Sequence, residues 1–202
     1  PPFVAMLANG TSGNINNIDF SKPGEKRAPY EKMREVADHV AQAAHKAYGT
    51  IQWKNTVPLA SQYVEYEIGV RHPTSEQQAR AKVILAEAKD KTSLEYIYAD
   101  RTIKQADWPD AIPIPLQTLR IGDVAIAGIP CEVFVETGLA FKEKSPFKPS
   151  FIVSLNNGYY GYLPTPEHHK LGGYETWLGT NRLEVEASDK LLAELLAMTK
   201  EL

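Results

Sequence analysis

The sequence contains a single cysteine, Cys131, no long hydrophobic run and no large excess of either charge. One cysteine excludes an intramolecular disulfide framework and a zinc cluster built from several cysteines. No run of about eighteen apolar residues is present, so no segment has the composition of a transmembrane helix. With 22 basic and 25 acidic residues the formal charge is -3. A protein with this balance offers no basic face for nucleic acid.

The common catalytic motifs are also missing. His39 and His45 are six positions apart and therefore point to different sides of a helix. His168 and His169 are adjacent, and we expect both to be solvated. There is no H-x-x-x-H or H-E-x-x-H pattern, so a metal ion would need imidazole ligands from elsewhere. There is also no G-x-S-x-G, which disfavours an α/β hydrolase with a serine triad.

The pattern of apolar residues predicts a globular α/β protein. At 202 residues, with 43% hydrophobic and 23% charged side chains, the chain is long enough for one sizeable core. Helical spacing predicts helices over 29–48, 74–89 and 187–202, and another that follows Pro130 and ends near Lys144. Residues 94–101 either extend the second helix or form a separate one.

Strands are predicted over 4–8, 61–71 and 150–155, and over two segments of 118–130 joined by a turn at Gly122-Asp123. The proline-bounded stretch 108–117 is expected to lead into the first of these segments. Strands and helices alternate, which predicts a layered mixed β-sheet with flanking helices, with residues 1–202 forming one domain. The chain begins as if with a buried strand, which suggests that an earlier half of the domain is missing.

Polar loops follow the predicted strands, and ligands usually bind at strand ends in such sheets. The first loop offers amides, hydroxyls and backbone N–H groups to a polar or anionic ligand, and its glycines allow close approach. The alternative is an Asx-rich turn that satisfies its own backbone. The candidate ligand-binding residues in this loop are Asn9, Thr11, Ser12, Gly13, Asn14, Asn16 and Asn17.

Three segments, taken in order, resemble the second half of the catalytic domain of the neutral/alkaline (non-lysosomal) ceramidases and their bacterial relatives. SGNINN resembles the GDVSPN segment of that family, and IPCEVFVETG resembles its PGEF segment, with a glycine six residues after the glutamate. YLPTPEHHKLGGYE resembles Y-x-T-T-x-E-E-Y-x-x-x-x-Y-E. The resemblance spans Ala8 to Glu175. In the third segment the residues in register are Tyr162, Thr165, Pro166, Glu167, Tyr174 and Glu175.

The resemblance implies that Glu132 and Tyr162 are zinc ligands and that Tyr174 binds substrate or stabilises the oxyanion. The other two ligands in the family are histidines from the earlier half of the catalytic domain. That half, or another chain, is therefore expected to complete the site. Glu132 is predicted to lie at the start of a helix, the alternative being an ordinary first-turn glutamate, and Glu136 either orients a ligand or is simply exposed.

The resemblance fails at the catalytic nucleophile. The serine of GDVSPN corresponds here to Asn16, and Asn14 stands where the family has an aspartate. A carboxamide cannot attack an amide carbonyl. Either a zinc-activated water is the nucleophile, or the substrate is not ceramide, or the site binds without turnover. Asn16 would then hold substrate or water.

The sequence therefore predicts a zinc-dependent, ceramidase-like amidohydrolase that acts on an N-acyl or ester bond of a small or lipid-like substrate. That substrate is either a sphingolipid or another N-acylated or esterified compound, such as a sugar derivative. The alternative is a non-catalytic ligand-binding protein with the same fold. Tyr160 is a further candidate for substrate binding, although ring packing would also explain the cluster of Tyr159, Tyr160 and Tyr162. The resemblance favours a periplasmic or secreted location. No nucleic acid and no transmembrane segment are expected.

Overall fold

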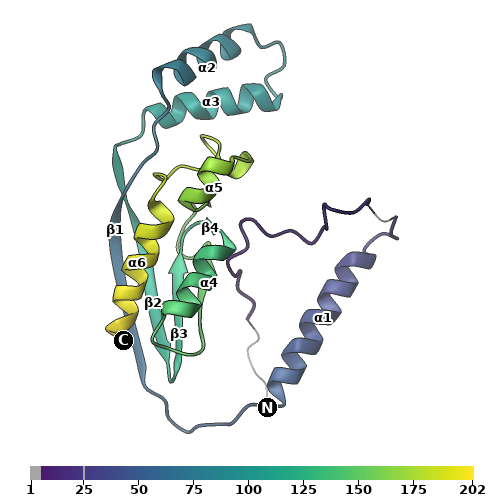
Figure 1. The fold of residues 1–202 in the computed structure, drawn as a ribbon, viewed down its shortest axis with the longest axis vertical. Coiled ribbons are helices and arrows are strands. Elements are labelled where there is room, and N and C mark those ends of the chain that lie inside the picture. Colours follow the sequence, from purple (N-terminus) through teal and green to yellow (C-terminus); the bar gives the residue numbers. More distant parts are fainter. Residues whose placement is uncertain (1–5, 25) are drawn as a thin grey trace. The chain divides into compact units, whose positions relative to one another are not determined.

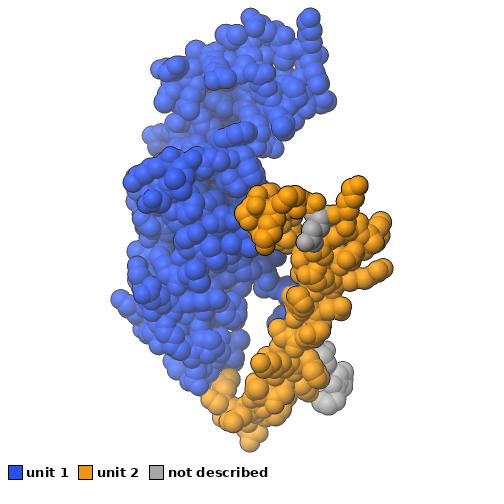
Figure 2. All heavy atoms as spheres, turned by 45° about the vertical axis from the view of Figure 1, so that its right-hand side comes forward, with its two compact units in different colours: residues 1–15, 58–202 blue, residues 16–57 orange. Residues whose placement is uncertain are grey.

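The structure is a computed structural model that describes residues 6–24 and 26–202 (Figure 1). The chain divides into two compact units (Figure 2). One comprises the residues up to Ile15 together with 58–202, and the other comprises 16–57. The strand predicted over 4–8 falls partly outside the described residues, and its described part, 6–8, is not a strand. Within the described residues, no helix is both long and apolar enough to cross a membrane.

The smaller unit contains helix α1 (Glu31–Tyr48), which confirms the helix predicted over 29–48. The helix ends at Tyr48 and is capped by Gly49, whose N–H donates to the carbonyl oxygen of His45 at 3.2 Å. None of its residues is buried. Its apolar positions Met33 and Val40 therefore remain exposed, at 67% and 52%.

A four-stranded mixed sheet forms the centre of the larger unit. It consists of β1 (Leu59–Gly69), β2 (Ala111–Ile121), β3 (Val124–Ile129) and β5 (Ser150–Ser154), in the order β1-β2-β3-β5. β1–β2 and β2–β3 are antiparallel, and β3–β5 is parallel. The predicted turn joins β2 to β3, with Gly122 at φ 63°. The α/β prediction of a mixed sheet with flanking helices is confirmed.

The prediction that 108–117 only leads into a strand is wrong, because β2 begins at Ala111. Pro113 and Pro115 pair with residues of β1, whereas β3 pairs with β2 only from Gln117 onward. The prolines therefore lie where one side of β2 has no β3 partner. Because proline lacks an N–H, such a position costs no hydrogen bond in the ladder.

Two helices pack on the sheet, and two form a hairpin beyond its end (Figure 1). α6 (Ala187–Lys200) contacts β1, β2 and β3, and α4 (Val135–Lys144) contacts β5. The hairpin of α2 (Ser75–Glu87) and α3 (Leu94–Ala106) connects β1 to β2. Residues 94–101 thus belong to a separate helix, and the helices predicted over 74–89, 187–202 and up to Lys144 are confirmed.

A second, two-stranded sheet pairs β4 (Glu132–Val133) with β6 (Tyr162–Leu163) in parallel. It is followed by the short helix α5 (Pro166–Leu171) and the 3-10 helix η1 (Tyr174–Thr176). None of these four elements is predicted from the sequence, because each is too short for hydrophobic periodicity to reveal.

The core lies between the main sheet, α4 and α6. Each fully buried aliphatic or aromatic side chain contributes about 1.5–3 kcal/mol of burial free energy. Val133 and Leu163, from the small sheet, are 0% and 1% exposed and join this core. Their burial turns the neighbouring residues of β4 and β6 toward the opposite side. Other core members are Ile68, Ile114, Leu116, Ile129, Phe141, Ile152, Leu183, Leu191 and Leu195.

Candidate functional site

The parallel pairing of β4 and β6 brings the two predicted metal ligands together. Glu132 and Tyr162 are register partners in this small sheet. The N–H of Glu132 donates to the carbonyl oxygen of Gly161 at 3.0 Å, which holds the pair in register. Because Val133 and Leu163 point into the core, Glu132 and Tyr162 point away from it and line the same cavity.

The prediction that Glu132 starts a helix is wrong. Helix α4 begins three residues later, at Val135. The N–H of Phe134 still donates to the carbonyl oxygen of Leu163, at 3.3 Å, so strand pairing continues to the residue before the helix. Glu136, rather than Glu132, occupies the first turn of α4, where a carboxylate favours the positive helix end.

Three phenols line the cavity together with Glu132. The hydroxyl of Tyr159 donates to Oε1 of Glu132 at 3.0 Å. The hydroxyl oxygens of Tyr162 and Tyr174 are 2.9 Å apart, and their rings meet edge to face with centroids 5.5 Å apart. Gly172 and Gly173, at φ 81° and 105°, make the sharp turn that brings Tyr174 to this position.

Burial raises the pKa of the Tyr162 phenol, and its hydrogen bonds with Tyr174 and Glu132 raise it further. Burial also raises the pKa of Tyr159, followed by its hydrogen bond to Glu132. Both phenols are therefore protonated near neutral pH. A divalent cation beside Tyr162 would act in the opposite direction and favour the phenolate.

The cavity has a volume of about 450 Å³, within the usual range of small-molecule sites, about 300–1,000 Å³. Besides Glu132 and the three phenols it is lined by three cations, Arg101, Lys104 and Arg182. The Arg182 guanidinium lies over the rings of Trp108 and Tyr159, at 5.3 and 5.7 Å from their centroids. The cavity thus combines one carboxylate with several positive groups.

Sequence reasoning missed four of these lining residues. Tyr159 adjoins the predicted Tyr160, so its place in the tyrosine cluster was the available clue. Arg101 and Lys104 come from α3, and Arg182 follows η1. No motif connects these three cations with Glu132, since only the tertiary packing brings them to one cavity.

The two predicted ligands do not complete a metal site by themselves. Glu132 and Tyr162 offer two oxygen atoms, whereas catalytic zinc usually has three protein ligands. Among the described residues no group of three or more His, Cys, Asp or Glu side chains could hold a metal ion. The two predicted ligands therefore fit a metal site only if further ligands join them. Cys131 is no such ligand in this fold, because it is fully buried and burial raises its thiol pKa to about 12.

The side chain of Asn14 joins the polar loop, residues 9–17, to helix α4 through hydrogen bonds. Its side-chain Oδ1 accepts the N–H of Val135 at 2.9 Å. Its Nδ2 donates to both carboxylate oxygens of Glu136, at 2.9 and 3.2 Å. Asn14 thereby satisfies one of the free N–H groups at the start of α4, in the way that an N-cap residue does. Glu136 orients this loop residue, and Asn14 as a substrate contact stays a prediction.

Three other residues of the loop, Gly13, Thr11 and Asn9, contact β4, α4 and β5 of the larger unit. The N–H of Gly13 donates to the carbonyl oxygen of Val133 at 2.8 Å. A Cβ atom at Gly13 would lie 2.5 Å from the backbone oxygen of Glu132, so this approach requires glycine. The side chain of Thr11 packs against Gly138. The backbone carbonyl oxygen of Asn9 accepts the N–H of Ser154 at 2.9 Å.

The remaining predicted residues lie elsewhere. Asn16 is the first residue of the smaller unit, and its Oδ1 accepts the N–H of Ile18 at 3.1 Å in an Asx turn. Ser12 is exposed, with a long 3.4 Å contact to the carbonyl oxygen of Gly10. Tyr160 packs against the core and is not among the residues that line the Glu132 cavity. Their roles in binding or catalysis stay predictions.

The expectation that His168 and His169 are solvated is wrong, since both are partly buried. Nδ1 of His168 is 2.7 Å from the Thr165 hydroxyl, and its ring meets that of Phe134 edge to face. Nδ1 of His169 is 3.1 Å from a guanidinium nitrogen of Arg71. Burial, followed by the charge of Arg71, lowers the pKa of His169 to about 4.

No protein-family model and no curated protein matches this sequence. Among solved structures, the neutral ceramidase from Pseudomonas aeruginosa is similar, with a TM-score of 0.63 and 18% identity over 98% of this chain and 37% of that chain. This chain has a ceramidase-like fold. A ceramidase complexed with C2 is also similar, with a TM-score of 0.54 and 14% identity over 84% of this chain and 34% of that one. The chain thus spans little more than a third of either solved structure.

Proposed function

We propose that the protein is a zinc-dependent, ceramidase-like hydrolase of an N-acyl or ester bond. One observation carries the proposal: Glu132 and Tyr162 are register partners in one cavity, with the Tyr174 hydroxyl 2.9 Å from that of Tyr162. The ceramidase-like fold supports the same chemistry. In this proposal residues 1–202 are the C-terminal portion of a catalytic domain, and an N-terminal part or another chain completes the zinc site.

A zinc ion held by Glu132 and Tyr162 would supply Lewis-acid polarisation of the scissile carbonyl and of a water molecule. The Tyr159 hydroxyl donates to Oε1 of Glu132 and so orients its carboxylate. Tyr174 lies within hydrogen-bond distance of Tyr162 and would donate to the carbonyl oxygen as negative charge develops there. The nearby charge of Arg182 would stabilise the same oxygen.

The polar loop would contribute to substrate binding, with Asn16 holding substrate or water because its carboxamide cannot be the nucleophile. The apolar part of the substrate would be lipid-like, as in a sphingolipid, and the site of action would be periplasmic or extracellular. The role of Asn16 rests on its place in SGNINN, where the ceramidases have GDVSPN, and the lipid-like substrate and the location rest on the resemblance to the family as a whole.

The test combines metal analysis with a panel of N-acyl and ester substrates, using the longest natural form of the protein. We expect stoichiometric zinc, and a fall in kcat/KM of about 10²-fold or more in Glu132→Gln. Glu67→Gln is the matched control, because Glu67 is an exposed glutamate of β1 outside this cavity. Hydrolysis that is equally fast in Glu132→Gln and in the unmodified protein would overturn the proposal.

The second candidate is a non-catalytic binding protein. Asn16 favours it, because a carboxamide cannot replace the serine nucleophile, and its side-chain oxygen already accepts the N–H of Ile18 in its own turn. The same experiment separates the two functions. Metal-free protein that hydrolyses no member of the panel, yet binds an N-acyl compound equally well in Glu132→Gln, would establish the binding protein.

A further inference from the structure

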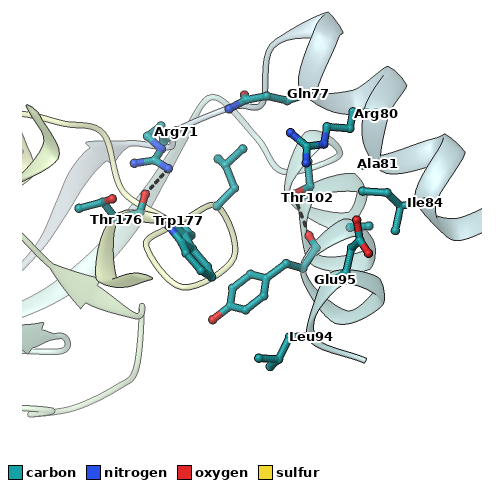
Figure 3. A pocket seen from close by; sticks show the side chains of 13 residues that line it. Arg71, Gln77, Arg80, Ala81, Ile84, Leu94, Glu95, Thr102, Thr176 and Trp177 are labelled. Carbon is teal, nitrogen blue, oxygen red and sulfur yellow. Dashed lines mark hydrogen bonds between the residues drawn. The ribbon is translucent and has the colours of Figure 1, made fainter. Parts of the chain in front are cut away.

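A second cavity, of about 680 Å³, lies where the α2–α3 hairpin faces η1 and the residues after it (Figure 3). Its volume is within the usual range of small-molecule sites. Figure 3 shows Arg71 and Trp177 on one side of the space, and Arg80, Ile84 and Glu95 on the other. Neither Glu132 nor Tyr162 lines it. It is therefore a separate candidate site.

The walls of this cavity are largely apolar. Ile84 from α2, Leu94 from α3, and Trp177 and Leu178 after η1 all face it. Leu94 and Trp177 are 71% and 51% exposed, so large apolar surfaces remain uncovered at this site. Tyr98 meets Trp177 edge to face with ring centroids 5.0 Å apart, which holds the indole in position. These walls suit an apolar chain.

Arg71 places a partly buried positive charge at the cavity, and no carboxylate of the described residues pairs with it. Its guanidinium donates to the carbonyl oxygen of Thr176 at 2.5 Å and lies 3.1 Å from Nδ1 of His169. His169 is neutral at pH 7, because burial lowers its pKa to about 4. Within the described residues no carboxylate forms an ion pair with Arg71, although buried charges are normally paired.

Arg80 adds a second positive group. Its side chain extends from α2 into the cavity (Figure 3), and it forms no ion pair or hydrogen bond with any described residue. Glu95 is the acidic residue of the lining, and it pairs with neither arginine in the described part of the chain. The lining thus carries two positive charges against one negative charge. Guanidinium groups bind carboxylates through charge-assisted, often bidentate, hydrogen bonds.

We propose that this cavity binds a single-chain monocarboxylate. Its apolar chain packs on Leu94 and Trp177, and its carboxylate accepts hydrogen bonds from Arg80 and from the remaining N–H groups of Arg71. This site goes beyond the proposed hydrolase, because it requires neither a metal ion nor the Glu132 cavity. Failure of the hydrolase proposal therefore leaves it intact.

Calorimetric titration with octanoate and with octanol tests the proposal. We expect octanoate to bind at least about 10-fold more tightly than octanol, since only the carboxylate pairs with the arginines. Arg80→Gln should weaken octanoate binding by about 10-fold and leave octanol binding unchanged. Lys82→Gln is the matched control, because Lys82 is an exposed cation of the same helix that does not line the cavity.

A second variant tests the apolar part of the site. Leu94→Gln replaces a side chain that is already exposed, so the fold is retained, and octanoate affinity should fall by several-fold. Glu132→Gln should bind octanoate normally. Equal affinity for octanol and octanoate, or equal losses in Arg80→Gln and Lys82→Gln, would overturn the proposal. So would an absence of octanoate binding.

Discussion

The two cavities of the larger unit differ in how their side chains are held. In the Glu132 cavity, strand register fixes the positions of the side chains, because Glu132 and Tyr162 are paired across β4 and β6 beside buried neighbours. In the second cavity, which Arg71 lines, the side chains are held by packing between α2, α3 and the η1 region. Tyr98 lines both.

The difference has a chemical consequence. A reaction needs oxygen atoms placed to within a fraction of an ångström, and a register pair supplies this because neither strand can slip without exposing a core residue. Apolar binding tolerates looser placement, since dispersion and burial depend on area rather than direction. The register-built cavity therefore fits the proposed catalysis, and the helix-built cavity fits the proposed binding of a chain.

The largest effect that separates the cavities is expected from Tyr162→Phe. The substitution removes one proposed metal ligand and the hydroxyl partner of Tyr174, while the ring continues to pack. Zinc content should fall, and kcat/KM should drop by about 10²-fold. Octanoate binding, measured by calorimetry, should not change. A drop in octanoate affinity would show that the two cavities are coupled.

Tyr98→Ala should affect both cavities. Tyr98 accepts a hydrogen bond from the Thr180 hydroxyl at 2.9 Å, and its ring contacts Trp177. Removing the ring should lower the free energy of unfolding by about 2 kcal/mol, measured by urea denaturation, and should also weaken octanoate binding. Tyr98→Phe keeps the ring and should therefore retain most of the unfolding free energy and most of the octanoate affinity. If Tyr98→Ala binds octanoate normally, the shared wall contributes nothing to the site.

Asn14→Ala should cost stability. The substitution removes the hydrogen bonds to Val135 and Glu136, and loss of such a cap typically costs about 1 kcal/mol. Thermal or urea unfolding measures this loss. Asn17→Ala, at an exposed position, should change stability by less than about 0.5 kcal/mol. A raised KM in Asn14→Ala, with stability unchanged, would instead place this side chain against the substrate.

The last expected effect is a pH dependence of stability at His169, and it is confined to acid pH. Burial lowers its pKa from 6.5 to about 4, so the folded protein binds fewer protons than the unfolded chain between these values. The contribution of His169 is therefore complete above pH 6.5 and is lost as the pH falls toward 4. The difference in unfolding free energy between the unmodified protein and His169→Gln should shrink over this window. A difference that is constant with pH would contradict the assignment.

The long periodic segments were predictable. The helices over 31–48, 75–87 and 187–200, and the strands around the Gly122 turn, follow from apolar spacing and turn chemistry. The start of α4 was predicted wrongly, because the pairing of Glu132 with Tyr162 is a contact between residues thirty positions apart. β2 was missed in part because prolines disfavour a strand unless one edge is unpaired.

By itself, the sequence determined the α/β character of the chain and the loop segments that resemble ceramidases, since both are carried by local patterns. Only the tertiary structure decided that Glu132, Tyr162 and Tyr174 meet in one cavity, that Asn14 fastens its loop to α4, and that Arg71 and Arg80 line a second cavity. The physical reason is that burial and register act between distant residues, and no local spacing encodes them.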